Sequence, residues 1–219
     1  MTRLLDIGIE KIGNVIADMA KISENCIMNA IESYENGIEN KEQIYEWSEK
    51  LRSMQDEVSD IAVELIARYQ PVATDLRYIR SCNEISYVYS RFGRYSLDIV
   101  DTIYLLGNLN GCDKSVVREM SKTVRNMILL SINALKTRDK TAVEKLYEMD
   151  DTVDLIYRKY LRDISGMEQR SMNERMGINV HCYISTALIL KFLERISDHA
   201  CYVGDSVNYF VTGSSKPRH

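Results

Sequence analysis

The sequence contains few of the residues that interrupt helices. Only 2 prolines and 10 glycines occur among its 219 residues. Because these residue types mark turns and loops, their scarcity favours long helices over many short strands. Long apolar runs are lacking too, since no stretch approaches the roughly 20 apolar residues that a membrane-spanning helix needs. We therefore expect a protein that does not span a membrane.

An excess of positive charge is lacking as well. The chain has 28 lysines and arginines against 32 aspartates and glutamates, a formal net charge of −4. Proteins that bind nucleic acids generally need a basic face to neutralise phosphates, so no nucleic-acid partner is expected. The N-terminus does not read as an export signal, because acidic residues enter at Asp6 and Glu10. The sequence thus predicts a soluble, cytoplasmic protein.

The cysteines lack the spacing of a zinc or redox motif. There are 5, an odd number, and no two form a Cys-x-x-Cys pair. We interpret them as reduced and mostly buried thiols of a cytoplasmic protein, rather than as a disulfide or zinc framework. They are Cys26, Cys82, Cys112, Cys182 and Cys201.

Apolar residues recur at spacings of three and four through almost the whole chain, which predicts amphipathic helices. Pro71 suits the start of the third helix, and Asp113 suits the N-cap of the fourth. Each helix has one apolar stripe, and short connections favour antiparallel packing into bundles. The predicted helices span residues 3–35, 41–69, 72–106, 114–137, 140–164 and 173–211.

The two halves of the chain resemble each other. Residues 90–101 (SRFGRYSLDIVD) align with residues 194–205 (ERISDHACYVGD), which places Arg91 on Arg195. Residues 53–60 and 148–155 correspond in the same way. The fold class predicted is all-α, with two tandem antiparallel three-helix bundles related by an internal repeat. The first repeat is assigned to residues 1–108, the second to 112–212, and a flexible tail to 213–219.

Carboxylates occupy positions where the helical stripes call for apolar residues. Asp150 lies in the apolar stripe of the fifth helix, and Asp154 follows one turn later. Glu194 and Asp198 form the same pair in the sixth helix. Like charges at this spacing repel each other, and near an apolar interface they need compensation. If the two helices face each other, a hard multivalent cation such as Mg²⁺, Mn²⁺, Ca²⁺ or oxygen-ligated iron could supply it, with zinc less favoured.

Three functions remain open from the residues alone. The first is a non-enzymatic protein that binds metal through these carboxylates. The second is a helical interaction scaffold whose carboxylates are merely ion-paired, for example with Arg158 or Arg195. The third is a metal-dependent hydrolase or redox protein, which would need a base and an open coordination site that the sequence does not reveal. His199 points about 100° around the helix from Asp198, so we interpret it as a structural or dimer-contact residue rather than a ligand.

The carboxylate segments resemble those of the PhoU family. Residues 193–200 (LERISDHA) are similar to the family motif LERIGDHA, with Ser197 in place of glycine. Residues 150–154 (DDTVD) match the family's DDxVD stretch, and residues 71–77 (PVATDLR) resemble the entry into its third helix. The resemblance covers essentially the whole chain. It implies duplicated three-helix units, paired E(D)xxxD metal motifs and frequent dimerisation.

The resemblance also implies a non-enzymatic function. A PhoU-like protein represses the phosphate-starvation response through contacts with the ATPase of the phosphate ABC transporter and with a sensor kinase, which could recruit it to the membrane. The implied cofactor is a divalent or trivalent metal, namely iron, Mn, Mg or Zn. The expected ligands are Asp150, Asp154, Glu194 and Asp198, with Asp151 and Asp205 as possible additional ligands.

The first repeat departs from the family pattern. At the positions that correspond to the carboxylates it has Gln55, Ser59, Ser90 and Arg94. Three neutral groups and one arginine cannot hold a hard cation. Arg94 instead places a fixed positive charge there, which we expect to pair with Asp56, Asp60 or Asp98. A metal site is therefore predicted in the second repeat only.

Overall fold

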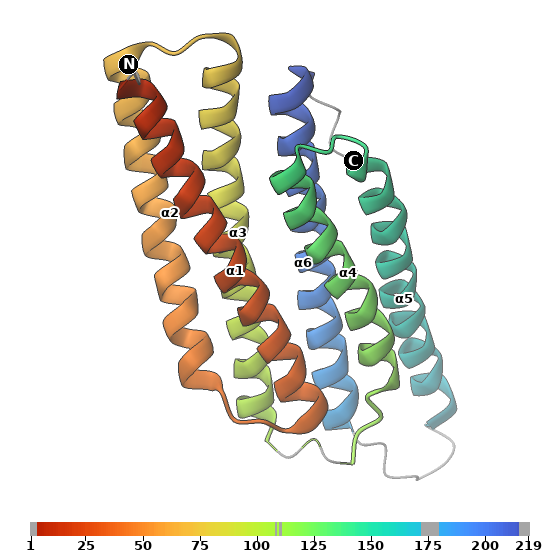
Figure 1. Ribbon diagram of the computed structural model, residues 1–219. Coiled ribbons are helices and arrows are strands. Elements are labelled where there is room, and N and C mark those ends of the chain that lie inside the picture. Colours follow the sequence, from red (N-terminus) through yellow and green to blue (C-terminus); the bar gives the residue numbers. More distant parts are fainter. Residues whose placement is uncertain (1–3, 108, 110, 172–179, 215–219) are drawn as a thin grey trace.

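The structure is a computed structural model that describes residues 4–107, 109, 111–171 and 180–214. These residues form six α-helices and no strand, which confirms the all-α prediction (Figure 1). Within the same ranges, no helix is long and apolar enough to cross a membrane. The helices are α1 (Leu4–Asn36), α2 (Lys41–Tyr69), α3 (Ala73–Leu106), α4 (Ser115–Thr137), α5 (Ala142–Ser171) and α6 (Val180–Thr212).

The observed bounds of α1 to α4 agree with the predicted ones within one residue. The predicted end of the fifth helix at 164 was wrong, because α5 continues to Ser171. The single Gly166 in that stretch did not end the helix, since one glycine inside a helix costs only about 1 kcal/mol relative to alanine. The predicted start of the sixth helix, at 173–179, lies outside the described residues, and so does the tail from 215 onward.

The starts of α3 and α4 each differ slightly from the prediction. Pro71 lies before the N-cap of α3, which is Val72. Lys114, and not Asp113, is the N-cap of α4. Oδ1 of Asp113 nevertheless accepts a hydrogen bond from the backbone N–H of Ser115 at 2.9 Å, so Asp113 satisfies one free donor of the first turn.

Each half of the chain forms a three-helix bundle, and the two bundles lie side by side (Figure 1). The main contact between them is made by α3 and α6, which run antiparallel through the centre. The hydroxyl of Ser81 on α3 donates to the carbonyl oxygen of Ser206 on α6 at 3.0 Å, within this buried contact. The arrangement confirms the tandem repeat predicted from the sequence.

Two glycines allow close helix packing. A Cβ on Gly93 would lie 2.8 Å from Cδ1 of Leu51 and 3.1 Å from Cα of Ser48, so α3 and α2 approach closely there. A Cβ on Gly204 would lie 2.8 Å from Cδ1 of Leu146. This second contact fixes α6 against α5, the pair of helices that carries the predicted metal ligands.

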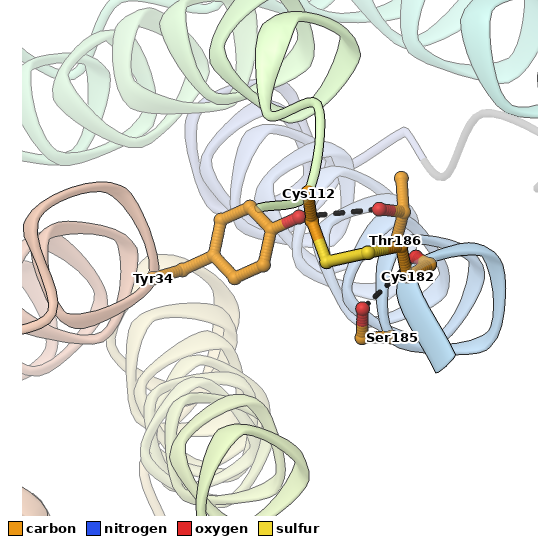
Figure 2. The surroundings of a disulfide bond; sticks show 5 residues. All are labelled: Tyr34, Cys112, Cys182, Ser185 and Thr186. Atoms are coloured by element: carbon orange, nitrogen blue, oxygen red, sulfur yellow. Dashed lines mark hydrogen bonds between the residues drawn. A yellow bond between two sulfur atoms is a disulfide. The ribbon is translucent and has the colours of Figure 1, made fainter. Parts of the chain in front are cut away.

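The prediction that all five cysteines are free was wrong. Cys112, between α3 and α4, forms a disulfide with Cys182 in α6, with 5.3 Å between the Cα atoms (Figure 2). The two residues are 70 positions apart in sequence. Sequence spacing did not reveal the pair because the antiparallel course of α6 returns its start to the end of α3. Cys26, Cys82 and Cys201 are free and buried, as expected.

Candidate metal-binding site

The four predicted ligands lie on α5 and α6, which pack against each other. Asp150 and Asp154 are one turn apart on α5, while Glu194 and Asp198 are one turn apart on α6. The negative charges of Glu194, Asp150 and Asp154 all act on Asp198 and make its ionisation less favourable. The four carboxylates therefore form one interacting group on the seam between the two helices.

Two members of this group resist ionisation. Burial raises the pKa of Asp198 to about 6, and the charges of Glu194 and Asp150 add to the rise. Burial also raises the pKa of Asp150, again with the help of neighbouring carboxylates. Carboxyl groups with raised pKa values in a partly buried site are typical of functional sites, although structural ion networks produce them too.

Asp150 also contains a buried acceptor that lacks a donor. Its Oδ1 atom is buried and has no hydrogen-bond partner. Ser197 lies close enough to Asp150 to lower its pKa against the rise caused by burial. Its hydroxyl, however, donates to the carbonyl oxygen of Glu194 at 2.8 Å. A buried acceptor without a donor is costly, and a cation would satisfy it.

Cationic side chains of the protein hold the two remaining carboxylates. Nη2 of Arg158 lies 2.5 Å from Oδ2 of Asp154, an ion pair that the sequence had offered as an alternative to metal. Nζ of Lys191 lies 2.7 Å and 2.6 Å from the two carboxylate oxygens of Glu194. The sequence analysis missed Lys191, although its spacing of three residues from Glu194 is a signal for such a pair. Arg195 is a weaker partner of Glu194, at 3.9 Å.

With these ion pairs formed, the carboxylates do not enclose an ion. In the described ranges no three Asp, Glu, His or Cys side chains lie close enough together to hold a metal. The donor set itself suits a hard cation, because it consists of carboxylate oxygens. To complete the coordination, Lys191 and Arg158 would have to swing away. Both are long, flexible side chains, with 34% and 72% of their surface exposed.

The two possible additional ligands lie in different surroundings. Asp151 is exposed on α5. Asp205 accepts hydrogen bonds from the hydroxyl of Tyr147 to both of its carboxylate oxygens, at 2.9 Å each. This contact ties α6 to α5 and gives Asp205 a packing role in the structure.

The corresponding site of the first repeat contains an internal cation. Nη2 of Arg94 lies 2.9 Å from Oδ1 of Asp98, so Asp98 is the partner among the three that were expected. Burial raises the pKa of Asp98, and Arg94 counteracts the rise. Gln55, Ser59 and Ser90 are partly exposed on α2 and α3 and add no charge. The two repeats thus present different chemistry at equivalent places.

His199 is a buried residue of the contact between the bundles. Only 8% of its surface is exposed. Its ring packs against Tyr95 with 5.3 Å between the centroids and against Tyr202 at the same separation. Nδ1 donates to the carbonyl oxygen of Arg195 at 2.9 Å. These contacts give it a structural role within the chain.

Comparison with known proteins agrees with this duplicated architecture. The family model of the PhoU domain matches the chain twice, at residues 16–103 and 117–207. The chain belongs to the PhoU family. Each match covers most of one three-helix bundle, so both repeats are PhoU domains.

Curated PhoU relatives match over nearly the full length. A protein of Clostridium acetobutylicum is 28% identical, over 97% of this chain and 97% of its own length. One of Zymomonas mobilis is 27% identical, over 93% of this chain and 84% of its own length. Both are described as phosphate-specific transport system accessory protein PhoU homologues.

Solved PhoU structures share the fold. The phosphate transport system regulatory protein PhoU from Streptococcus pneumoniae superimposes with a TM-score of 0.85, at 16% identity, over 97% of this chain and 99% of that one. PhoU from Pseudomonas aeruginosa gives a TM-score of 0.73 at 22% identity, over 96% of each chain. At such low identities the likeness concerns the fold alone.

Proposed function

We propose that this PhoU-family chain is a regulatory accessory protein of a phosphate transport system, and not an enzyme. The observation that carries the proposal is the match of both bundles to PhoU domains, together with curated full-length relatives of that description. The protein acts by contacting the ATPase of a phosphate ABC transporter, a sensor kinase, or both. It works in the cytoplasm as a dimer, and its partners bring it to the membrane.

Deletion of the gene in the organism that encodes the chain tests the regulatory function. With phosphate in excess, loss of the regulator should raise phosphate uptake and switch on phosphate-starvation genes, and the wild-type chain should restore repression. Unchanged uptake and gene expression in the deletion strain would refute the proposal.

Purified proteins test the partners. The tagged chain, co-expressed with the phosphate-transporter ATPase of the same genome, should retain it through size-exclusion chromatography. The ATPase of an unrelated transporter serves as the control. Light scattering on the same column distinguishes a dimer from a monomer. If the chain retains neither the ATPase nor the sensor kinase, both proposed contacts are refuted.

The second repeat binds a hard metal ion as part of this function. Asp150, Asp154, Glu194 and Asp198 would hold the ion. The unsatisfied Oδ1 of Asp150 and the raised pKa values of Asp150 and Asp198 support the assignment, because a cation favours the ionised carboxylates. The ion would neutralise four converging negative charges and fasten α5 to α6.

Elemental analysis tests the metal site. Asp150→Asn and Glu194→Gln keep the shapes of the side chains and remove their charges, and each should lower the bound iron or manganese severalfold. Gln55→Ala and Ser90→Ala, at the corresponding places in the first repeat, are the matched controls and should leave the metal content unchanged. Full retention of metal by both carboxylate variants would eliminate this site.

A second candidate is a metal-free helical scaffold. The ion pairs of Arg158 with Asp154 and of Lys191 with Glu194 favour it, because they already compensate two of the four carboxylates. In that case the wild-type chain would carry no stoichiometric metal after purification without chelator, and the Asp150→Asn chain would restore repression in the deletion strain as fully as the wild-type chain does.

A further inference from the structure

The five cysteines differ in their access to solutes. Cys26, Cys82 and Cys201 are 0%, 1% and 3% exposed. Burial raises the pKa of the Cys26 and Cys82 thiols to about 12 and raises that of Cys201 as well. These three thiols stay protonated, and a protonated, buried thiol is a poor nucleophile. Cys112 and Cys182 are both partly exposed, so oxidants and reductants reach this pair alone among the five.

Cys112 and Cys182 lie in different parts of the fold, so we expect Cys182 to react first with an oxidant and Cys112 to form the bond with it. Cys182 lies in the first turn of α6, where the helix dipole favours a thiolate. Cys112 lies between α3 and α4, in the segment that joins the two repeats. The Cα separation of 5.3 Å is within the range that a disulfide spans.

The disulfide sits where the first repeat meets the second (Figure 2). One turn along α6 from Cys182, Oγ1 of Thr186 forms a hydrogen bond with the hydroxyl of Tyr34 on α1, at 3.1 Å. Nζ of Lys114, two residues after Cys112, donates to the carbonyl oxygen of Glu35 at 3.3 Å. It also lies 5.3 Å from the centroid of the Tyr34 ring.

The joining segment also forms part of a groove of about 1370 Å³ at this end of the first bundle. Gly107, Leu109 and Lys114 line the groove from the segment, and Tyr34 and Asn40 line it from α1 and its turn. A covalent bond between Cys112 and α6 therefore restrains one wall of the groove. Without the bond, weak contacts such as the Lys114 hydrogen bond hold that wall.

We propose that Cys112 and Cys182 are a reversible oxidation site, at which a hydroperoxide locks the segment between the repeats to α6 and a dithiol releases it. Disulfides of cytoplasmic proteins are usually transient and redox-sensing, so this inference rests on the cytoplasmic location proposed above. It does not depend on the phosphate-regulatory function.

The hydroperoxide oxidises the two thiols to a disulfide in two steps. The Cys182 thiolate attacks one oxygen of the hydroperoxide, the O–O bond breaks, and a sulfenic acid and an alcohol (water for hydrogen peroxide) result. The Cys112 thiol then loses its proton and attacks the sulfenic sulfur; the S–S bond forms, the S–O bond breaks, and the hydroxide that leaves takes up that proton as water. Two thiols lose two electrons in total, and the peroxide gains them. Exchange with a dithiol reverses the change and leaves the dithiol as a disulfide.

Oxidation of the full-length chain tests the chemistry. The chain is fully reduced, freed of reductant and treated with one equivalent of hydrogen peroxide, then denatured and labelled with a polyethylene glycol maleimide. The wild-type chain should lose two of its five labels, and mass spectrometry should find the Cys112 and Cys182 peptides linked. A dithiol should restore both labels. Cys112→Ser and Cys182→Ser should show no such linked peptide.

Hydrogen exchange tests the consequence in the wild-type protein and needs no substituted chain. The backbone amides of Leu109 and of residues 111–114 should exchange at least about threefold more slowly in the oxidised chain than in the reduced one. Amides of the second half of α2, at residues 56–69, do not line the groove; they should be unchanged and serve as the internal control. Equal exchange in both states, or oxidation of Cys182 to a sulfinic acid without the link, would overturn the proposal.

Discussion

Tyr95 on α3 and His199 on α6 pack edge to face, with 5.3 Å between ring centroids and 79° between ring planes. The two residues are 104 positions apart, which is the offset that aligns the repeats. Equivalent positions of the two PhoU domains therefore touch each other in the contact between the bundles. His199, which neighbours the carboxylate pair in sequence, thus packs the repeats together.

The burial of His199 predicts a pH dependence of stability. Burial lowers its pKa from 6.5 to about 4. Between these values the unfolded chain binds a proton that the folded chain does not, so the free energy of unfolding falls as pH falls through this window. Replacement with Phe keeps an aromatic ring against Tyr95 and removes the effect. As the pH falls from about 7.5 to about 5, the free energy of unfolding of His199→Phe should rise by on the order of 2 kcal/mol relative to that of wild type.

Urea unfolding of chelator-treated protein at the two pH values measures the difference. Asp198 has the opposite effect on the free energy of unfolding. Its raised pKa of about 6 makes the folded chain bind a proton there that the unfolded chain does not, so this group stabilises the folded chain as the pH falls. Asp198→Asn should therefore shift the pH dependence in the direction opposite to His199→Phe. A parallel pH dependence of wild type and His199→Phe would show that His199 is not held neutral.

The sequence predicted features that repeat along a helix and missed those that depend on how two helices meet. The spacing of apolar residues located α1 to α4 almost to the residue, and it placed Asp150 beside the core. The ion pair of Lys191 with Glu194 lies within α6 at a spacing of three residues, so the sequence held a signal for it that we missed. The sequence could not pair Cys112 with Cys182, because their proximity arises from the packing of six helices.

The glycine of the family motif, replaced by Ser197 in the second repeat, is present in the first as Gly93. Gly93→Ala should destabilise the chain by about 1–3 kcal/mol, because the new methyl group would contact the backbone of Ser48 on α2. The gain in helix propensity, about 1 kcal/mol, offsets only part of this cost. Thermal or urea unfolding measures the change, and Gly166→Ala, where a Cβ would meet open space, is the matched control. A Gly93→Ala chain as stable as wild type would mean that α2 and α3 can separate without cost.

Lys191 should compete with metal for Glu194. The ammonium contacts both carboxylate oxygens, and the Glu194 side chain is only 14% exposed. Lys191→Met keeps an unbranched side chain of similar length and removes its charge. It should tighten Mn²⁺ binding about fivefold, which corresponds to about 1 kcal/mol for a partly exposed ion pair. Titration calorimetry measures the affinity, and Lys159→Met on the exposed side of α5 is the control. Equal Mn²⁺ affinity in wild type and Lys191→Met would argue that Glu194 does not bind the ion.

The asymmetry of the repeats predicts that a second metal site can be built into the first. Four substitutions, Gln55→Asp, Ser59→Asp, Ser90→Glu and Arg94→Asp, reproduce the carboxylate pattern of α5 and α6 on α2 and α3. They also remove the cation that pairs with Asp98. The metal content by elemental analysis should double relative to wild type, because both repeats are PhoU domains and the new carboxylates stand at the positions that correspond to those of the second repeat. A chain with Asn, Asn, Gln and Asn at the same four positions has the same shapes without the charges and should keep the wild-type metal content. If the acidic variant folds and gains no metal, the carboxylates of the second repeat are insufficient by themselves to bind an ion.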